Sequence, residues 1–288
     1  MITDVAKRGI SMIEFWMALT DPDFVFLRLA LFVGIFASFT FGVIGTFVVT
    51  RRISYLTGAI SHCIFGGIGG GLYLQQVIGW EWCDPIYGAV AVACLAAVVI
   101  GLVSLYSKQR EDTVIGALWA IGMAAGLLFI DRVPGSFDIS SYLFGDILLI
   151  SEIDVYLVIV LNLVVLFTVL LFYNKLVAVC YDEEFARLRG INTGIYYITL
   201  LCVTALTVVL LVRIVGIVMV IALLTLPAAI AGQYARKLWQ MMALAILLCI
   251  CFISVGLFFS FHFSFSSGPT IIIIAGISYL ITIILKRG

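Results

Sequence analysis

Side chains capable of acid–base, nucleophilic or metal chemistry are scarce in this chain of 288 residues. Its only two histidines, His62 and His262, cannot form a multi-histidine metal cage within one chain. Ser61 directly precedes His62, and adjacent residues point about 100° apart around a helix, so the two cannot form a serine–histidine dyad. The chain contains neither a G-x-x-x-x-G-K-[ST] phosphate-binding loop nor an H-E-x-x-H zinc motif. The sequence therefore argues against ATP binding by this chain and against enzymatic catalysis.

His62 is the candidate with the most unusual surroundings, because it lies inside the long apolar stretch 55–78. If that stretch crosses a membrane, an ionisable group there is costly and usually faces a pathway or a polar partner. We expect His62 either to contact a transported ion or to make a structural hydrogen bond.

Two further candidates lie near the ends of apolar stretches. Asp146 belongs to the connection 131–152, where it is a candidate ligand for cations at an outer mouth or, alternatively, a helix cap. His262 lies between two phenylalanines, where an interfacial histidine facing solvent is the simplest interpretation and a place on a metal pathway is the second.

The stretch around His62 is also rich in glycine. Gly66 and Gly70, and likewise Gly67 and Gly71, form two overlapping small-x-x-x-small pairs. Such pairs let helix backbones approach closely inside a membrane. We expect these four glycines to form a helix-packing surface.

The composition shows what must position these residues. Hydrophobic residues make up 64% of the chain and charged residues only 11%, whereas a soluble domain is about half apolar and about a quarter charged. Because a membrane-spanning helix needs roughly 20 apolar residues, the chain is predicted to be an all-α, polytopic bundle of eight or nine spans. The candidate segments are 24–50, 55–78, 85–107, 113–130, 153–173, 194–212, 214–233, 239–261 and 269–285. The break at Arg213, between segments 194–212 and 214–233, would be a tight hairpin or a broken helix.

The basic residues predict the orientation of these spans, because lysine and arginine in short loops face the cytoplasm. An alternating path through nine spans places 11 of the 16 basic residues inside. The N-terminus is then outside and the C-terminus inside. On this path residues 1–23 form an extracytoplasmic or interfacial segment, and residues 24–288 form the membrane domain.

Six stretches occur in a fixed order along the chain, namely 45–52, Ser61–His62, 142–148, 182–187, 216–236 and 267–271. Together they resemble the ABC-3 family of importer permeases, which serve zinc, manganese and iron. The resemblance covers nearly the whole chain, and although each stretch is weak alone, six in register are specific. Many family members carry Asp four residues before the histidine, where this chain has Gly58, so His62 would have to act with groups from a partner subunit.

The resemblance implies a type II-like importer permease fold that dimerises around a central path. It implies three protein partners, namely a cytoplasmic ATP-binding subunit, an extracytoplasmic metal-binding lipoprotein or periplasmic protein, and a second permease chain, identical or not. The implied location is the lipid bilayer of a bacterial cytoplasmic membrane. Neither a nucleic acid nor a stably bound cofactor is expected, and the divalent metal is the cargo.

A chain without a nucleotide site needs an external motor, and two inward segments could contact it. Pro227 should bend its span where it leaves the bilayer, and the span should continue inside as a basic, small-residue helix through Arg236 and Lys237. Ala231 is small enough to fit a groove on the ATP-binding subunit. Arg236 and Lys237 could pair with acids there, or serve only as anchors next to lipid headgroups. The segment 181–190 is predicted to be a short amphipathic helix closed by glycine, with Phe185 as a second contact.

Two other functions fit the composition. A secondary cation carrier driven by an ion gradient usually buries paired carboxylates in its spans, whereas nearly all acids here fall in loops. A non-transporting scaffold or receptor would need neither the glycine-rich span nor the basic inward segment. The metal stays open, because one histidine suits zinc slightly better than manganese, which prefers oxygen ligands.

Overall fold

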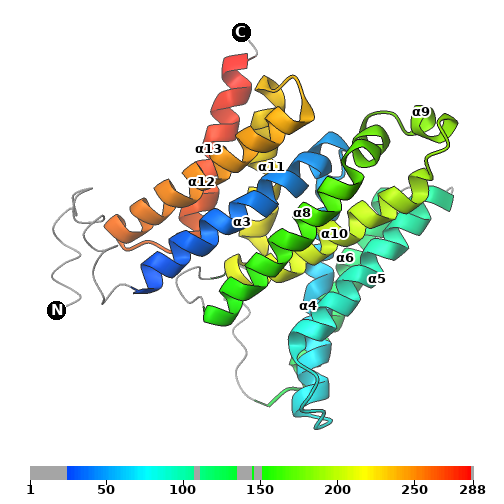
Figure 1. The fold of residues 1–288 in the computed structure, drawn as a ribbon. Helices are drawn as coiled ribbons and strands as arrows, with labels where there is room; N and C mark the ends of the chain where they lie inside the picture. Colours follow the sequence, from blue (N-terminus) through cyan, green and yellow to red (C-terminus); the bar gives the residue numbers. More distant parts are fainter. Residues whose placement is uncertain (1–24, 107–110, 135–144, 146–150, 287–288) are drawn as a thin grey trace. The chain divides into compact units, whose positions relative to one another are not determined.

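The computed structural model describes residues 25–106, 111–134, 145 and 151–286, and within them all regular structure is helical (Figure 1). The predicted all-α class is therefore confirmed. The helices are α3 (Val25–Thr50), α4 (Ser54–Gln76), α5 (Pro85–Tyr106), α6 (Glu111–Ile130), α8 (Glu152–Tyr181), α9 (Glu183–Leu188), α10 (Thr193–Val215), α11 (Ile217–Tyr234), α12 (Leu238–Phe263) and α13 (Ser267–Lys286).

Eight of these helices are long and apolar enough to cross a membrane, in agreement with the predicted eight or nine spans. Helix α4 has 23 residues and is also long enough, but its serines, glutamines and glycines make it less apolar. The boundary expected at Arg213 lies instead at Gly216, whose φ of 81° and ψ of 161° separate α10 from α11. Only glycine adopts this conformation readily, so the break occurs there and Arg213 stays inside α10.

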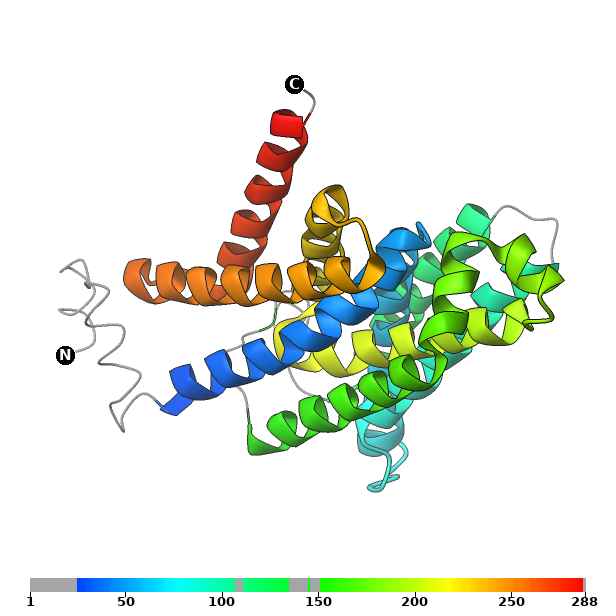
Figure 2. The same cartoon turned by 45° about the horizontal axis from the view of Figure 1, so that its top comes forward.

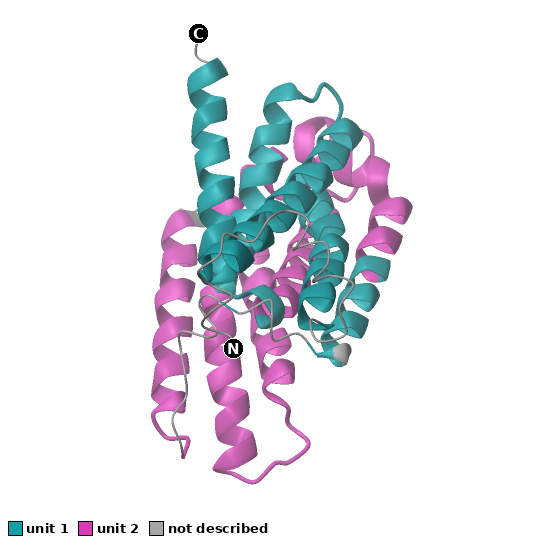
Figure 3. Ribbon diagram, turned by 90° about the vertical axis from the view of Figure 1, so that its left-hand side faces the viewer, with its two compact units in different colours: residues 1–46, 140–163, 213–288 teal, residues 47–139, 164–212 magenta. Residues whose placement is uncertain are grey.

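The chain divides into two compact units (Figure 3). Unit 1 comprises residues 1–46, 140–163 and 213–288, and unit 2 comprises residues 47–139 and 164–212. The boundaries fall within helices α3, α8 and α10, so each of these helices contributes to both units.

Unit 1 is built around α11, α12 and α13, which pack against one another, with α13 crossing α12 (Figure 2). Glycines on α3 allow close approach, because a Cβ at Gly42 or Gly45 would overlap the backbone of α12 or α11 respectively. Helix α3 also binds α8 through Asn162, whose Nδ2 donates to the Phe36 carbonyl at 2.9 Å and whose Oδ1 accepts from the Thr40 hydroxyl. A hydrogen-bonded amide of this kind links helices where apolar contacts alone give little specificity.

Unit 2 is built around α4, which packs closely against α5 and α6. A Cβ on Gly66 would lie 2.7 Å from the Gly122 carbonyl oxygen of α6, and one on Gly69 would lie 2.6 Å from the Gly126 oxygen. On another side of α4, Gly67 faces the backbone of α5 in the same way. Helix α4 is therefore held between two neighbours at backbone contact distance.

Candidate functional site

His62 lies on α4 and stacks on Trp119 of α6, with ring centroids 4.4 Å apart and an interplanar angle of 13°. The glycines produce this stack, because a Cβ on Gly122, one turn after Trp119, would lie 2.6 Å from Cα of Cys63, the residue after His62. Within the described residues the imidazole makes no hydrogen bond. A ring contact therefore holds the imidazole there, its ring nitrogens have no described protein partner, and both expected roles of His62 stay predictions.

The other two candidate metal-pathway residues are Asp146 and His262. No group of three or more histidine, cysteine or acidic side chains that could hold a metal ion is found among the described residues. Asp146 lies outside them. His262 belongs to unit 1, where it stacks on Phe258 at 5.9 Å and contacts the edge of Phe263 at 4.5 Å. The pathway roles of all three residues stay predictions.

The four glycines predicted as a packing surface differ in their surroundings. Gly66, Gly67 and Gly71 all lie where a Cβ would clash with a neighbouring backbone. Gly70 faces only the Phe129 ring at 3.8 Å, which is an ordinary contact, and Gly69 occupies the tight position instead. The small-x-x-x-small spacing did not single out Gly69, because that spacing pairs Gly66 with Gly70 and Gly67 with Gly71 and leaves Gly69 out.

The inward segment around Pro227 differs from the expected basic helix. Pro227 lies inside α11, and Ala231 is fully buried. The helix ends at Tyr234 because Ala235 adopts an extended conformation, so Arg236 and Lys237 lie in the exposed connection before α12. The expectation that these two residues extend the helix is therefore wrong in that detail.

A contact that sequence reasoning missed holds the end of α11. Lys286, in the last turn of α13, donates to the Gln233 carbonyl and lies 5.6 Å from the centroid of the Tyr234 ring. A lysine near a helix C-terminus is the usual partner for such free carbonyls. The sequence shows a lysine at this end of the chain, but no pattern within it predicts that Lys286 binds the end of another helix.

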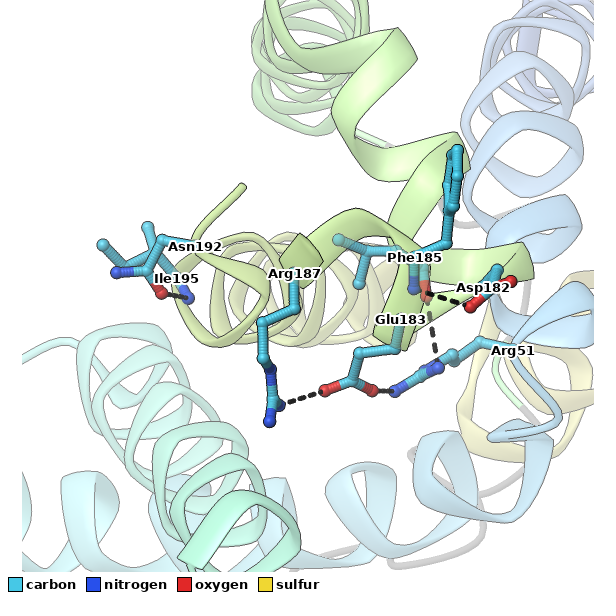
Figure 4. Close-up of polar contacts among 8 residues, drawn as sticks. Arg51, Asp182, Glu183, Phe185, Arg187, Asn192 and Ile195 are labelled. Atoms are coloured by element: carbon cyan, nitrogen blue, oxygen red, sulfur yellow. Dashed lines mark hydrogen bonds and ion pairs between the residues drawn. The ribbon is translucent and has the colours of Figure 1, made fainter. Parts of the chain in front are cut away.

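The second inward segment forms the predicted short helix, α9 (Figure 4). The Asp182 side chain caps it by accepting from the Phe185 N–H at 2.9 Å. Gly190, with φ of 78°, closes it, while the Ile191 N–H bonds the Ala186 carbonyl at 3.1 Å. Phe185 is 51% exposed, whereas Ala186 is buried.

Arg51 connects α9 to the rest of unit 2. Its guanidinium forms an ion pair with Glu183, donates to the Val179 carbonyl at 3.1 Å and lies 5.1 Å from the Tyr197 ring centroid. Arg51 thus contacts α8, α9 and α10 at once. No local sequence pattern predicts this, because the partners lie more than 100 residues away.

An ion pair in unit 1 accounts for the two charges at the ends of α8 and α10. Asp154 Oδ1 lies 3.2 Å from Nε of Arg213, and its Oδ2 accepts from the Ser151 N–H and hydroxyl at 3.0 and 2.7 Å. Asp154 is 8% exposed. Because an unpaired buried charge is costly, the pair lets both residues lie within helices that cross the membrane.

The helices and these contacts define a multi-pass membrane protein whose charged contacts lie near helix ends. Residues 23–286 match the model of the ABC 3 transport family. The chain belongs to the ABC 3 transport family.

Similar proteins cover nearly the whole chain. The membrane protein slr2045 of Synechocystis sp. is 38% identical over 98% of this chain and 97% of its own length. The manganese transport system membrane protein MntC of Listeria monocytogenes is 30% identical over 92% of this chain and 93% of its own length. Among solved structures, PsaBC from Streptococcus pneumoniae in complex with Fab matches with a TM-score of 0.81 and 28% identity, covering 94% of this chain and 95% of that chain.

Proposed function

We propose that this protein is the permease subunit of an ATP-binding-cassette importer that moves a divalent metal ion, manganese in the first instance, into the bacterial cytoplasm. The observation that carries the proposal is the family match over residues 23–286. Similarity to a protein named for manganese transport supports the cargo. Zinc and iron are the competing cargoes.

The proposed complex contains a cytoplasmic ATP-binding subunit, an extracytoplasmic metal-binding protein and a second permease chain. The need for the ATP-binding subunit follows from the sequence, which has no phosphate-binding loop. In this arrangement the N-terminus lies outside and the C-terminus lies in the cytoplasm, with residues 1–23 preceding the membrane domain 24–288.

His62, Asp146 and His262 are the proposed contacts for the ion along its path. His62 is supported by its half-buried position and by ring nitrogens that make no hydrogen bond to a described residue. Since Gly58 supplies no carboxylate, the remaining ligands at His62 would come from water or from the second permease chain. Oxygen donors from those sources would suit manganese.

The ATP-binding subunit is proposed to contact the connection after α11 and the surface of α9. Arg236 and Lys237 are exposed and free to approach acidic groups on that partner. Ala231 is buried, so Ala231→Glu would disturb packing inside the permease as well as any contact. Replacing Arg236 and Lys237 by glutamine is the cleaner test. The loss of association relative to the wild type should be largest at low salt and shrink as salt rises, because salt screens exposed ion pairs in the wild type.

The function is tested by metal uptake into vesicles that contain this chain, the ATP-binding subunit and the extracytoplasmic protein from the same bacterium. We expect manganese uptake that requires ATP hydrolysis and that persists when proton and sodium gradients are collapsed. An ATP-binding subunit unable to hydrolyse ATP is the matched control. Uptake that follows an ion gradient and ignores ATP would instead support the secondary carrier, and competition by zinc or iron would rank the cargoes.

A further inference from the structure

Helix α9 is too short to be stable by itself, since isolated helices of fewer than about 12 residues are marginal in water. It has six residues. Its ends are held by the Asp182 cap and by the left-handed Gly190, and its side is held by the ion pair between Glu183 and Arg51. The orientation of α9 therefore depends on contacts outside the helix.

Arg51 is placed where its charge is satisfied by two groups. It follows the last residue of α3, and its guanidinium reaches the Val179 carbonyl near the end of α8. The guanidinium also reaches the Glu183 carboxylate in the first turn of α9 (Figure 4). A cation at the C-terminal ends of two helices and a carboxylate at the N-terminus of a third all match the helix dipoles. The contacts therefore support one another.

The two ion pairs of Glu183 differ in burial. The side chains of Arg51 and Glu183 are 23% and 24% exposed, whereas Arg187, which lies 3.3 Å from Glu183, is 70% exposed. Solvent screens an exposed pair strongly and a partly buried pair much less. Arg51 rather than Arg187 is thus the partner that fixes Glu183.

The outer surface of α9 carries apolar side chains that the described chain leaves uncovered. Phe185 is 51% exposed and Leu188 is 87% exposed, three residues apart on one face of the helix. The Arg189 guanidinium lies 4.8 Å from the centroid of the Phe185 ring. A cation against the ring disfavours insertion of this face into hydrocarbon, and it fits a protein surface with an apolar pocket beside acidic groups.

We infer that Arg51 is a positioning residue that holds α9 so that Phe185 and Leu188 bind the cytoplasmic ATP-binding subunit. The inference rests on the proposed function, because that function supplies the partner and puts α9 on its side of the membrane. Arg51 acts on transport through Glu183 and α9 and does not itself contact the metal.

The test compares Arg51→Gln and Glu183→Gln with Arg52→Gln in the complete complex. Arg52 carries the same charge one residue further on but forms no ion pair with a described residue. We expect each of the first two variants to weaken association of the ATP-binding subunit about tenfold, which is the change produced by ~1.4 kcal/mol. Arg52→Gln should leave association unchanged. Equal association in all three variants would overturn the inference.

Phe185→Ala provides a measurement that does not depend on the buried contacts, because an exposed side chain can be shortened without affecting folding. It should weaken association to a similar degree, and adding Arg51→Gln should cause little further loss, since both changes act through α9. Fully additive losses would show that Arg51 acts elsewhere. The exchange Arg51→Glu with Glu183→Arg should recover part of the association lost in either single charge reversal, which a general folding defect would not.

A fluorophore at Leu188→Cys in nanodiscs, with the exposed Cys251 replaced by serine, distinguishes the partner from lipid. A blue shift that requires the ATP-binding subunit supports the inference, and the same shift in its absence shows that lipid covers α9 and overturns it. If wild-type vesicles show no ATP-driven uptake, the proposed function fails. If they do and the α9 variants behave as wild type, only the inference fails.

Discussion

The imidazole of His62 is held by an aromatic ring rather than by a hydrogen bond to a described residue. Its plane lies 13° from that of Trp119 at a centroid distance of 4.4 Å. Such a stack restricts the rotation of the imidazole while leaving its nitrogens available, which is what an ion contact requires. Trp119 is 41% exposed, so the pair lies at the edge of unit 2 and not in its core.

At the residue scale we predict that Trp119→Leu lowers metal uptake roughly two- to tenfold, the range expected for losing one aromatic contact of about 0.5–1.5 kcal/mol. Trp119→Phe should retain most uptake because it keeps a ring face, and His62→Ala should lose more than Trp119→Leu. Uptake is measured in the reconstituted vesicles at equal amounts of assembled complex. Trp239→Leu, which removes an exposed indole of α12, is the control. Normal uptake in Trp119→Leu together with lost uptake in His62→Ala would show that the stack has no role.

The elements of unit 2 are positioned by particular glycines and not by glycine content. Helix α4 meets α6 at Gly66 and Gly69, whereas Gly70 has room for a methyl group at ordinary contact distance. The difference follows from the direction in which each Cα points toward a neighbouring backbone. The same α4–α6 contact brings His62 to Trp119, so packing in this region and the candidate pathway are linked.

At the element scale we predict that Gly66→Ala separates α4 from α6 and reduces the thermal stability of the detergent-solubilised protein by several degrees. A Cβ there would lie 2.7 Å from a backbone oxygen that no side-chain rotation can move aside. Gly70→Ala is the matched change in the same helix, and it should leave stability unchanged or raise it, because alanine favours helix by about 1 kcal/mol over glycine. Thermal melting followed by size-exclusion chromatography measures both. Equal effects of the two substitutions would contradict the assignment.

For the whole molecule, the distribution of charge and the helices fit one alternating path. The connection between α4 and α5 carries Glu81 and Asp84 and no lysine or arginine, whereas α9 with its C-cap residue Arg189 and the connection after α11 carry four basic residues between them. This asymmetry is typical of outer and inner loops respectively.

At this scale we predict that Arg187→Cys and Arg236→Cys react with a membrane-impermeant maleimide only after the inner face is opened, and that Glu81→Cys reacts in intact cells. Replacement of Asp138, which lies outside the described residues, should behave like Glu81→Cys. A chain retaining only its native cysteines gives the background. Labelling of Arg187→Cys and Glu81→Cys from the same face would reverse the proposed topology.

The sequence alone determined the properties that belong to single segments. Hydropathy identified the membrane class and the number of spans, because burial in lipid acts on each stretch of about 20 residues separately. The short inward helix could be predicted because Asp182 and Gly190 mark its ends locally. The family resemblance, confirmed over residues 23–286, likewise rests on short ordered motifs. The end of α11 was placed wrongly since nothing local shows that Ala235 is extended.

Only the tertiary structure decided which distant residues meet. Arg51 and Glu183 are 132 positions apart, and the sequence offered several equally basic and acidic residues as partners. The stack of His62 on Trp119, and the difference between Gly69 and Gly70, likewise depend on how helices lie against each other. Helix packing selects these pairs through steric fit between whole surfaces. That fit is a property of two surfaces together, and a pattern within either segment does not contain it.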